Sequence, residues 1–115
     1  MSKPSKKVQA VFDYLHHIDK RYELKNGGLE WYIHLKQSEI DVEISVFNHH
    51  KGIINGAVYF SKSRILRGTQ VYQVTFNQLE SVIMYGIQLI ESGNFNEKTD
   101  RHSYFDGGYG FRKVR

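Results

Sequence analysis

The sequence predicts a single α+β domain, in which a four-stranded antiparallel sheet lies between an N-terminal helix and a long C-terminal helix. A flexible tail follows. Apolar residues recur at helical spacing near the start of the chain and again after residue 76. Between these two segments, apolar and polar residues alternate, as in half-buried strands. The 115 residues, 40% of them hydrophobic, suffice for one core. We therefore expect one domain over residues 1–97 and a basic, aromatic, Gly-rich tail over residues 98–115.

The first helix is expected from about residue 5 to residue 23. Apolar residues at i, i+3, i+4 and i+7 spacing form one stripe along it, made of Val8, Val11, Phe12, Leu15, Ile18 and Tyr22. The segment Asn26-Gly27-Gly28 is expected to end this helix, because glycine favours a turn.

Four alternating segments predict the strands. The first two are expected over residues 31–36 and 40–47, and a turn over 48–52 leads to a third over 53–62. Asn55-Gly56 in the third strand is either a bulge or the tight turn itself. A basic loop over 63–68 precedes the fourth strand, over about 69–76. Alternation predicts that one side of these strands packs inward, namely Trp31, Ile33, Leu35, Val42, Ile44, Val46, Val58, Phe60, Tyr72, Val74 and Phe76.

The last helix is expected over residues 77–91, with Asn77 as its N-cap and Glu80 three residues later. Ser92-Gly93-Asn94 ends it. Its apolar stripe is wider than one thin sheet needs to cover. The stripe consists of Ile83, Ile87 and Ile90, which lie beside Met84 and Tyr85. We therefore expect a homodimer through this helix. The alternative is a monomer in which the N-terminal helix covers the surplus.

Basic residues are unevenly distributed along the chain, whose net charge is +4. Both ends are basic, whereas the central window over residues 44–79 contains no acidic residue. The cations of that window are Lys51, Lys62, Arg64 and Arg67. A polyanion is the natural partner of such a stretch. The alternative is that these are four scattered, solvated cations on an ordinary surface.

The second face of the predicted sheet carries aromatic rings among hydroxyl and amide groups, with cations at the strand ends. Unpaired bases stack on such rings for about 1–3 kcal/mol each, and cations release counterions from phosphates. The predicted nucleic-acid-binding residues are Tyr32, His34, Lys36, Phe47, Lys51, Tyr59, Lys62, Arg64 and Arg67. Alternatively, the rings form cross-strand pairs or a second core layer beneath the first helix. Asp41 and Glu43 on the same face count against binding across the whole sheet.

The run from Asp41 to Ser92 resembles the single-stranded-DNA-binding superfamily of positive cofactor four and the Whirly proteins. The matching pieces are WYIHLK (31–36), VEISVFNHHKG (42–52), GAVYFSK (56–62), RILRG (64–68) and QVTFNQLESVIMYGIQLI (73–90). The resemblance implies a dimer whose long helices pack together and whose sheets present grooves to single strands. It also implies phosphate contacts from the four cations of the central window, and base stacking on Phe47 and Tyr59. Phage and bacterial relatives serve in replication or recombination, and eukaryotic ones in transcription. This chain departs from the pattern in its extra His49-His50, its few basic loop residues and its N-terminal helix.

The sequence lacks the residue patterns of most catalytic and metal-binding sites. Without cysteine, the chain has no disulfides, iron–sulfur clusters or thiol nucleophile. The adjacent pairs His16-His17 and His49-His50 lack metal-ligand spacing, so no metal and no cofactor are expected. We expect no enzyme, although a nuclease using Asp41, Glu43 and a divalent metal is a weaker alternative. No apolar run approaches the ~20 residues of a membrane helix, and the start lacks a signal segment. We therefore expect a cytoplasmic protein without membrane contact.

The tail combines aromatic and basic residues. The predicted contacts there are Arg101, Tyr109, Phe111, Arg112, Lys113 and Arg115, which would add sequence-independent nucleic-acid affinity. Alternatively, the tail docks on a partner protein or on a second subunit. The sequence thus predicts a non-enzymatic protein that binds single-stranded DNA or RNA. The competing hypothesis is a small phage-type inhibitor or adaptor that binds a host protein or nucleoprotein complex.

Overall fold

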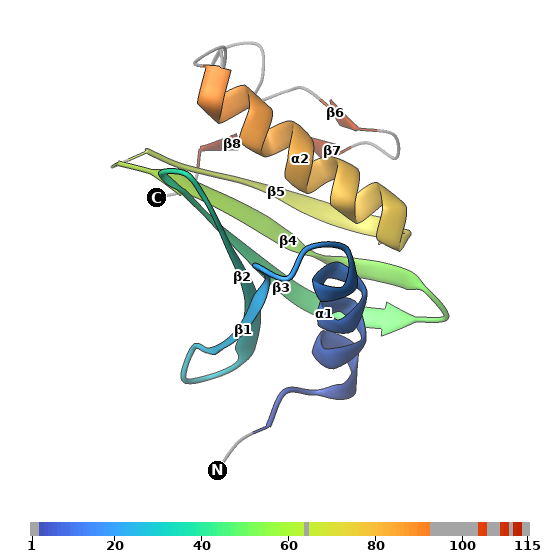
Figure 1. Cartoon of the computed structure of the whole chain (residues 1–115). Coiled ribbons are helices and arrows are strands. Elements are labelled where there is room, and N and C mark those ends of the chain that lie inside the picture. The colour runs from blue at the N-terminus through green and yellow to red at the C-terminus, as the bar shows by residue number, and fades with distance from the viewer. Residues whose placement is uncertain (1–2, 64, 93–103, 106–108, 111, 114–115) are drawn as a thin grey trace.

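The computed structural model describes residues 3–63, 65–92, 104–105, 109–110 and 112–113 (Figure 1). The elements are α1 (Lys6–Ile18), β1 (Glu23–Asn26), β2 (Trp31–Gln37), β3 (Ile40–His50), β4 (Ile53–Lys62), β5 (Ile65–Val74), α2 (Phe76–Ser92), β6 (Tyr104–Phe105), β7 (Tyr109–Gly110) and β8 (Arg112–Lys113). Along the chain, one helix precedes and one helix follows the five strands β1–β5 of an antiparallel sheet, which confirms the α+β class. The main sheet has the strand order β1-β2-β3-β4-β5-β8, and β6 pairs with β7 alone.

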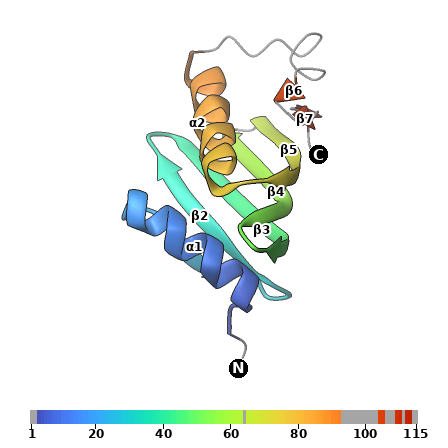
Figure 2. The same cartoon turned by 90° about the vertical axis from the view of Figure 1, so that its right-hand side faces the viewer.

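Both helices lie on the same face of the sheet (Figure 2). Helix α1 packs on β2 and β3, and α2 packs mainly on β4 with contacts to β3 and β5. The strand residues that alternation predicted as inward are buried under them, with the exceptions described below. The confirmed ones are Ile33, Leu35, Val42, Ile44, Val46, Val58, Phe60 and Val74. We call this side of the sheet the covered face and the other side the open face.

Gly86 sets how closely α2 approaches the sheet. A Cβ atom at this position would overlap the ring of Phe60, which is fully buried in β4. The absence of a side chain at Gly86 therefore lets the helix rest directly on the Phe60 ring. This contact joins the middle of α2 to the centre of the covered face.

The sheet has one more strand in its meander than the sequence predicted. Helix α1 ends at Ile18, and residues 23–26, which the prediction gave partly to this helix, form β1 beside β2. Tyr22 is buried, as the predicted helical stripe required, but it lies between α1 and β1 and belongs to neither element. The stripe misled because Tyr22 and Leu24 also fit the period-2 pattern of a strand with its inward side on the core.

The turns are shorter than predicted. Strand β3 continues to His50, and a two-residue turn of Lys51 and Gly52 joins it to β4. Both turn residues have positive φ values, 51° and 82°, as the favoured two-residue hairpin turns require. Strand β5 begins at Ile65, so most of the predicted basic loop over 63–68 is strand. Asn55-Gly56 lies at a register shift between β4 and β5 and not at a turn.

That register shift reverses the facing of β5 near its end. Tyr72, predicted to point inward, is 63% exposed, and Val71, predicted to point outward, is buried. Gln73 has a φ value of 57°, and its amide N–H donates to the Asn55 side chain (2.7 Å). The irregular backbone at Gln73 breaks the alternation on which the prediction relied. Of the residues predicted to point inward in this strand, only Val74 is buried.

Helix α2 begins at Phe76, one residue earlier than predicted. Thr75 precedes it, and the Thr75 hydroxyl accepts from the Gln78 amide (3.2 Å) while the Gln78 side chain accepts from the Thr75 amide (2.8 Å). This reciprocal pair is a capping box. Asn77, the predicted N-cap, instead accepts a hydrogen bond from the Tyr14 hydroxyl of α1 (2.6 Å). Phe76, predicted as a strand residue, is the first residue of the helix.

Candidate nucleic-acid interface

The open face carries several of the predicted binding residues. Tyr32, His34 and Lys36 alternate along β2 with the buried side chains, and Tyr59 stands on the same side of β4, in register with Glu43 and Gly68. Neither helix lies on this side of the sheet, so the two tyrosines are not a second core layer beneath α1. Both rings are half-buried by their neighbours in the sheet.

Charges of opposite sign pair on the open face. Asp41 accepts from the His34 ring (Nε2–Oδ1 3.0 Å) and lies 3.4 Å from the Lys36 ammonium. The hydrogen bond from His34, together with the nearby charge of Lys36, holds the pKa of Asp41 below its ordinary value of 3.8. Glu43 and Glu23 stand in register on either side of His34. Carboxylates therefore occupy the middle of this face, and phosphate groups would meet repulsion there.

The predicted phosphate contacts do not form one rim around the open face. Lys62 does lie at a strand end, but Arg67, expected in a loop, lies within β5. Lys62 and Arg67 share the covered side of their strands, since Lys62 alternates with Phe60 and Arg67 stands in register with it. Lys51 lies in the turn at the opposite end of β4. Arg64 lies outside the described residues.

One edge of the sheet brings distant basic segments together. Strand β8 pairs with β5, so that Lys113 stands in register with Arg67, and Arg112 with Gly68. Gly68 in turn stands beside Tyr59. We call Lys62, Arg67 and the β8 segment the basic edge. Of the other predicted tail contacts, Tyr109 lies in β7, and Arg101, Phe111 and Arg115 lie outside the described residues.

Phe47 is exposed for a local reason. It lies at a register shift in β3, where the alternation of the strand is interrupted, and 46% of it is exposed. Its carbonyl oxygen accepts a hydrogen bond from the Lys7 ammonium of α1 (2.7 Å). Phe47 is therefore at the start of α1 and away from the basic edge, so the predicted stacking residues Phe47 and Tyr59 do not form one surface.

A groove that sequence reasoning missed lies at the start of α1. It has a volume of about 220 Å³ and is lined by residues of the N-terminal segment, α1 and the β1–β2 loop, including Lys3, Lys7, Val8, Leu29, Glu30 and Trp31. Leu29 is fully exposed. The lysine run before the first helix and the single tryptophan were the available signals, but no pattern along the chain places them together.

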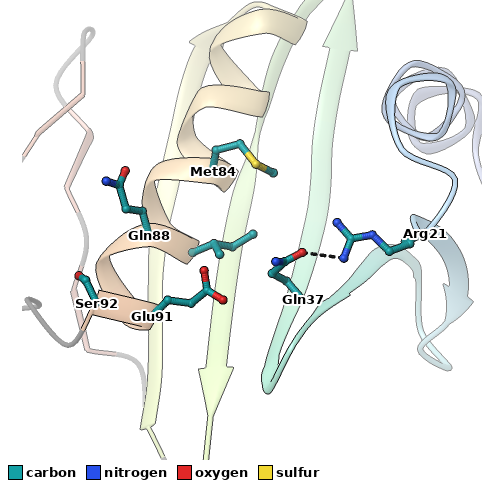
Figure 3. Close-up of a pocket in the computed structure, with 7 residues that line it drawn as sticks. Arg21, Gln37, Met84, Gln88, Glu91 and Ser92 are labelled. Atoms are coloured by element: carbon teal, nitrogen blue, oxygen red, sulfur yellow. Dashed lines mark hydrogen bonds between the residues drawn. The ribbon is translucent and has the colours of Figure 1, made fainter.

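A larger, shallow hollow of about 600 Å³ lies between α2 and the end of β2, with Arg21 also in its lining (Figure 3). Its lining includes Arg21, Gln37, Met84, Gln88, Glu91 and Ser92. The Arg21 guanidinium donates to the Gln37 side chain (2.6 Å) and forms an ion pair with Asp19 (2.7 Å). The charge of Arg21 is thus already compensated inside the protein, which makes this hollow a poor anion site.

The surplus apolar stripe that predicted a dimer is used inside the subunit. Ile83 and Ile87 of α2 are buried against the protein's own sheet. Met84 and Tyr85 are the exposed apolar residues of this helix. They leave a small surface for a second copy, much narrower than the stripe seen in the sequence.

The described residues contain no group of three or more acidic, histidine or cysteine side chains that could hold a metal ion. Asp41 and Glu43, the pair of the nuclease hypothesis, do share the open face. Within the same described residues, no helix is both long and apolar enough to cross a membrane.

Comparison with known proteins gives no relative. No family model, curated protein or solved structure matches the chain. The resemblance to the Whirly-type superfamily therefore stays a prediction that rests on the residues quoted for it.

Proposed function

We propose that the protein is a non-enzymatic single-stranded nucleic-acid-binding protein that holds its ligand along the basic edge. The observation that carries this proposal is the pairing of β8 with β5. It brings Arg112 and Lys113 from the tail next to Arg67, although these segments are far apart in the sequence. Each basic segment on its own fits a polyanion, and the pairing brings the two segments together on neighbouring strands at this edge.

The neighbouring aromatic ring favours an unpaired strand over a duplex. Tyr59 stands next to Gly68, which has no side chain, in the row that leads to Arg112. A base that has no partner strand can stack on such a ring, whereas the bases of a duplex are already stacked. The bound nucleic-acid strand would run along the basic edge and not across the open face, because Asp41 and Glu43 would repel its phosphates there.

The test is fluorescence anisotropy with single-stranded DNA, single-stranded RNA and duplex DNA of equal length at two salt concentrations. We expect micromolar or tighter binding to a single strand, weaker binding to the duplex, and loss of affinity as salt rises. Arg67→Ala should reduce the slope of log affinity against log salt by about 0.7, the value for one lost phosphate contact on a single strand. Tyr59→Ala should weaken binding without changing that slope.

Lys25→Ala is the matched control, because Lys25 is an exposed lysine of β1 at the opposite edge of the sheet. It should leave both affinity and slope unchanged. Equal affinity for single strand and duplex, or no binding to either, would refute the function. Equal effects of Lys25→Ala and Arg67→Ala would refute the placement at the basic edge.

A protein-binding adaptor is the second candidate, and the open face is the observation that favours it. The paired charges of His34, Lys36 and Asp41 suit a partner protein of complementary charge better than a polyanion. Affinity capture from a nuclease-treated lysate separates the two functions. A stoichiometric protein partner that survives nuclease and is lost in Asp41→Lys favours the adaptor, and loss of all partners with the nucleic acid favours the first proposal.

A homodimer through α2 is part of the proposal, with Met84 and Tyr85 as its contact. Sedimentation equilibrium of the protein and of Tyr85→Glu tests it, since a charge in this contact should abolish the dimer. A nucleic-acid role, in replication, recombination or transcription, agrees with the cytoplasmic location that the sequence predicts.

A further inference from the structure

The groove at the start of α1 combines an aromatic wall with two lysines. Trp31 follows the β1–β2 loop and is partly buried against the core, which fixes its ring in place. Leu29, in the loop before it, is fully exposed although it is a large apolar residue. Val8 of α1 also lines the groove. A flat, apolar molecule would therefore find both an aromatic ring and aliphatic side chains in the lining of this groove.

The charge of the groove comes from side chains and not from the end of the helix. Lys3 and Lys7 line it together with one carboxylate, that of Glu30. The Ser5 hydroxyl already accepts the Val8 amide, so that donor of the helix start is satisfied. Lys7 uses one of its three N–H donors on the Phe47 carbonyl, which holds its ammonium in place and leaves two donors. The groove thus suits a ligand with an apolar ring and a negative group.

The size of the groove limits what it can hold. Its volume of about 220 Å³ lies below the roughly 300–1,000 Å³ of pockets that enclose a drug-sized molecule. A single base fits this space, whereas a stack of several bases or a folded peptide does not. The ligand that matches ring, charge and size is one nucleotide.

We propose that this groove binds a nucleoside monophosphate, with the base against Trp31 and Leu29 and the phosphate at Lys3 and Lys7. The groove lies by the β1–β2 loop, at the edge of the sheet opposite to the basic edge, so this site does not rest on the proposed function. The ligand is either a free nucleotide or the 5′-terminal nucleotide of a strand, since both present the same base and phosphate.

Trp31 provides a direct readout, because it is the single tryptophan of the chain. Its fluorescence is followed during titration with dTMP, thymidine, inorganic phosphate, and oligo-dT with and without a 5′ phosphate. A stacked base should quench the emission in a saturable way. We expect thymidine and phosphate to bind at least about fivefold more weakly than the complete ligand, because each lacks one of its two contacts. Saturable quenching by dTMP identifies a free-nucleotide site, and quenching by the 5′-phosphorylated strand alone identifies a strand-end site.

Exposed residues give variants that should leave the fold intact. Lys3→Ala and Leu29→Ser should each weaken binding about fivefold or more. Lys6→Ala is the matched control, since Lys6 is an exposed lysine at the same helix start that is not among the groove residues, and its effect should stay within about twofold. Glu30→Gln should strengthen binding by removing the carboxylate that repels the phosphate.

Two results would overturn the proposal: no saturable quenching by either dTMP or the 5′-phosphorylated strand, or an equal loss of affinity in Lys6→Ala and Lys3→Ala. Arg67→Ala distinguishes a failure of this groove proposal from a failure of the proposed function. The variant should weaken the anisotropy signal of long single strands and leave the Trp31 response to dTMP unchanged.

Discussion

The two faces of the sheet use alternate residues of the same strands, but different interactions hold them. In β3, Val42 and Ile44 are fully buried beneath the helices, whereas Asp41 and Glu43 point to the open face. Packing governs the covered face, where each added or missing atom matters. Charge pairing governs the open face, where water reduces the strength of each pair. The covered face therefore determines the fold, and the open face and the edges are available for partners.

The covered face should be sensitive to a single methyl group at Gly86. Because a Cβ atom there would overlap the Phe60 ring, Gly86→Ala should lower the free energy of unfolding by about 2 kcal/mol, the usual cost of overpacking a core. Urea denaturation measures this change. Gln88→Ala, at an exposed position of the same helix, should change it by less than about 0.5 kcal/mol.

Helix propensity alone predicts that Gly86→Ala would raise the free energy of unfolding, because alanine is about 1 kcal/mol more favourable than glycine inside a helix. A Gly86→Ala protein that is as stable as the original would therefore show that α2 does not rest on Phe60. Combining Gly86→Ala with Phe60→Leu should recover part of the loss, because the smaller side chain makes room for the methyl group.

On the covered face, a buried polar atom without a hydrogen-bond partner should lower the stability of the protein. Tyr22 is buried, and no described residue lies within hydrogen-bonding distance of its hydroxyl. Tyr22→Phe should therefore raise the free energy of unfolding by about 1 kcal/mol at neutral pH. Burial, with the charges of Asp19 and Glu80, also raises the pKa of Tyr22 above its ordinary value of 10.0.

A raised pKa in the folded state means that the stability of the original protein is fully present below pH 10 and falls as the pH rises further. Tyr22→Phe should show a weaker alkaline decrease in denaturant midpoint than the original. A lower stability of Tyr22→Phe at neutral pH would mean that the hydroxyl has a partner in solution, and an unchanged alkaline profile would mean that the pKa of Tyr22 is not raised by folding.

The sequence predicted the covered face where alternation is uninterrupted and failed where the backbone departs from it. Along β2 and β3 every inward residue follows from the period of two. Strand β1 was missed because Leu24 is its single apolar residue. The facing of Val71 and Tyr72 was wrong because no residue pattern announces the positive φ of Gln73.

Tertiary contacts decided the start of α2. Thr75 and Asn77 are both good N-cap residues, and each has a Gln or Glu three residues later, so the sequence offers two equivalent capping boxes. The hydrogen bond from Tyr14 of α1 engages Asn77 and leaves the cap to Thr75. That contact joins residues from the two helices, which local pattern cannot relate.

The candidate site was predicted in its residue types and not in its arrangement. A strand that begins at Ile65 turns the expected loop into β5 and places Arg67 on the covered side, opposite to the face that carries Tyr59. The pairing of β8 with β5 has no local signal. The groove at Trp31 depends on the position of α1 relative to the β1–β2 loop, which alternation along one strand cannot give.

The smallest expected effect is on the open face, at Asp41. Its pKa lies below 3.8 because His34 and Lys36 stabilise the carboxylate, so its contribution is present above that pH and is lost as the pH falls through the lower folded-state value. Asp41→Asn should flatten the acid side of the stability profile, by less than about 1 kcal/mol because the pair is accessible to water. Denaturant unfolding from neutral pH to about pH 3 measures this, with Asp13→Asn on the outer surface of α1 as control. An acid profile that Asp41→Asn leaves unchanged would mean that the charges of the open face do not pair in solution. The difference between the two faces would then rest on packing alone.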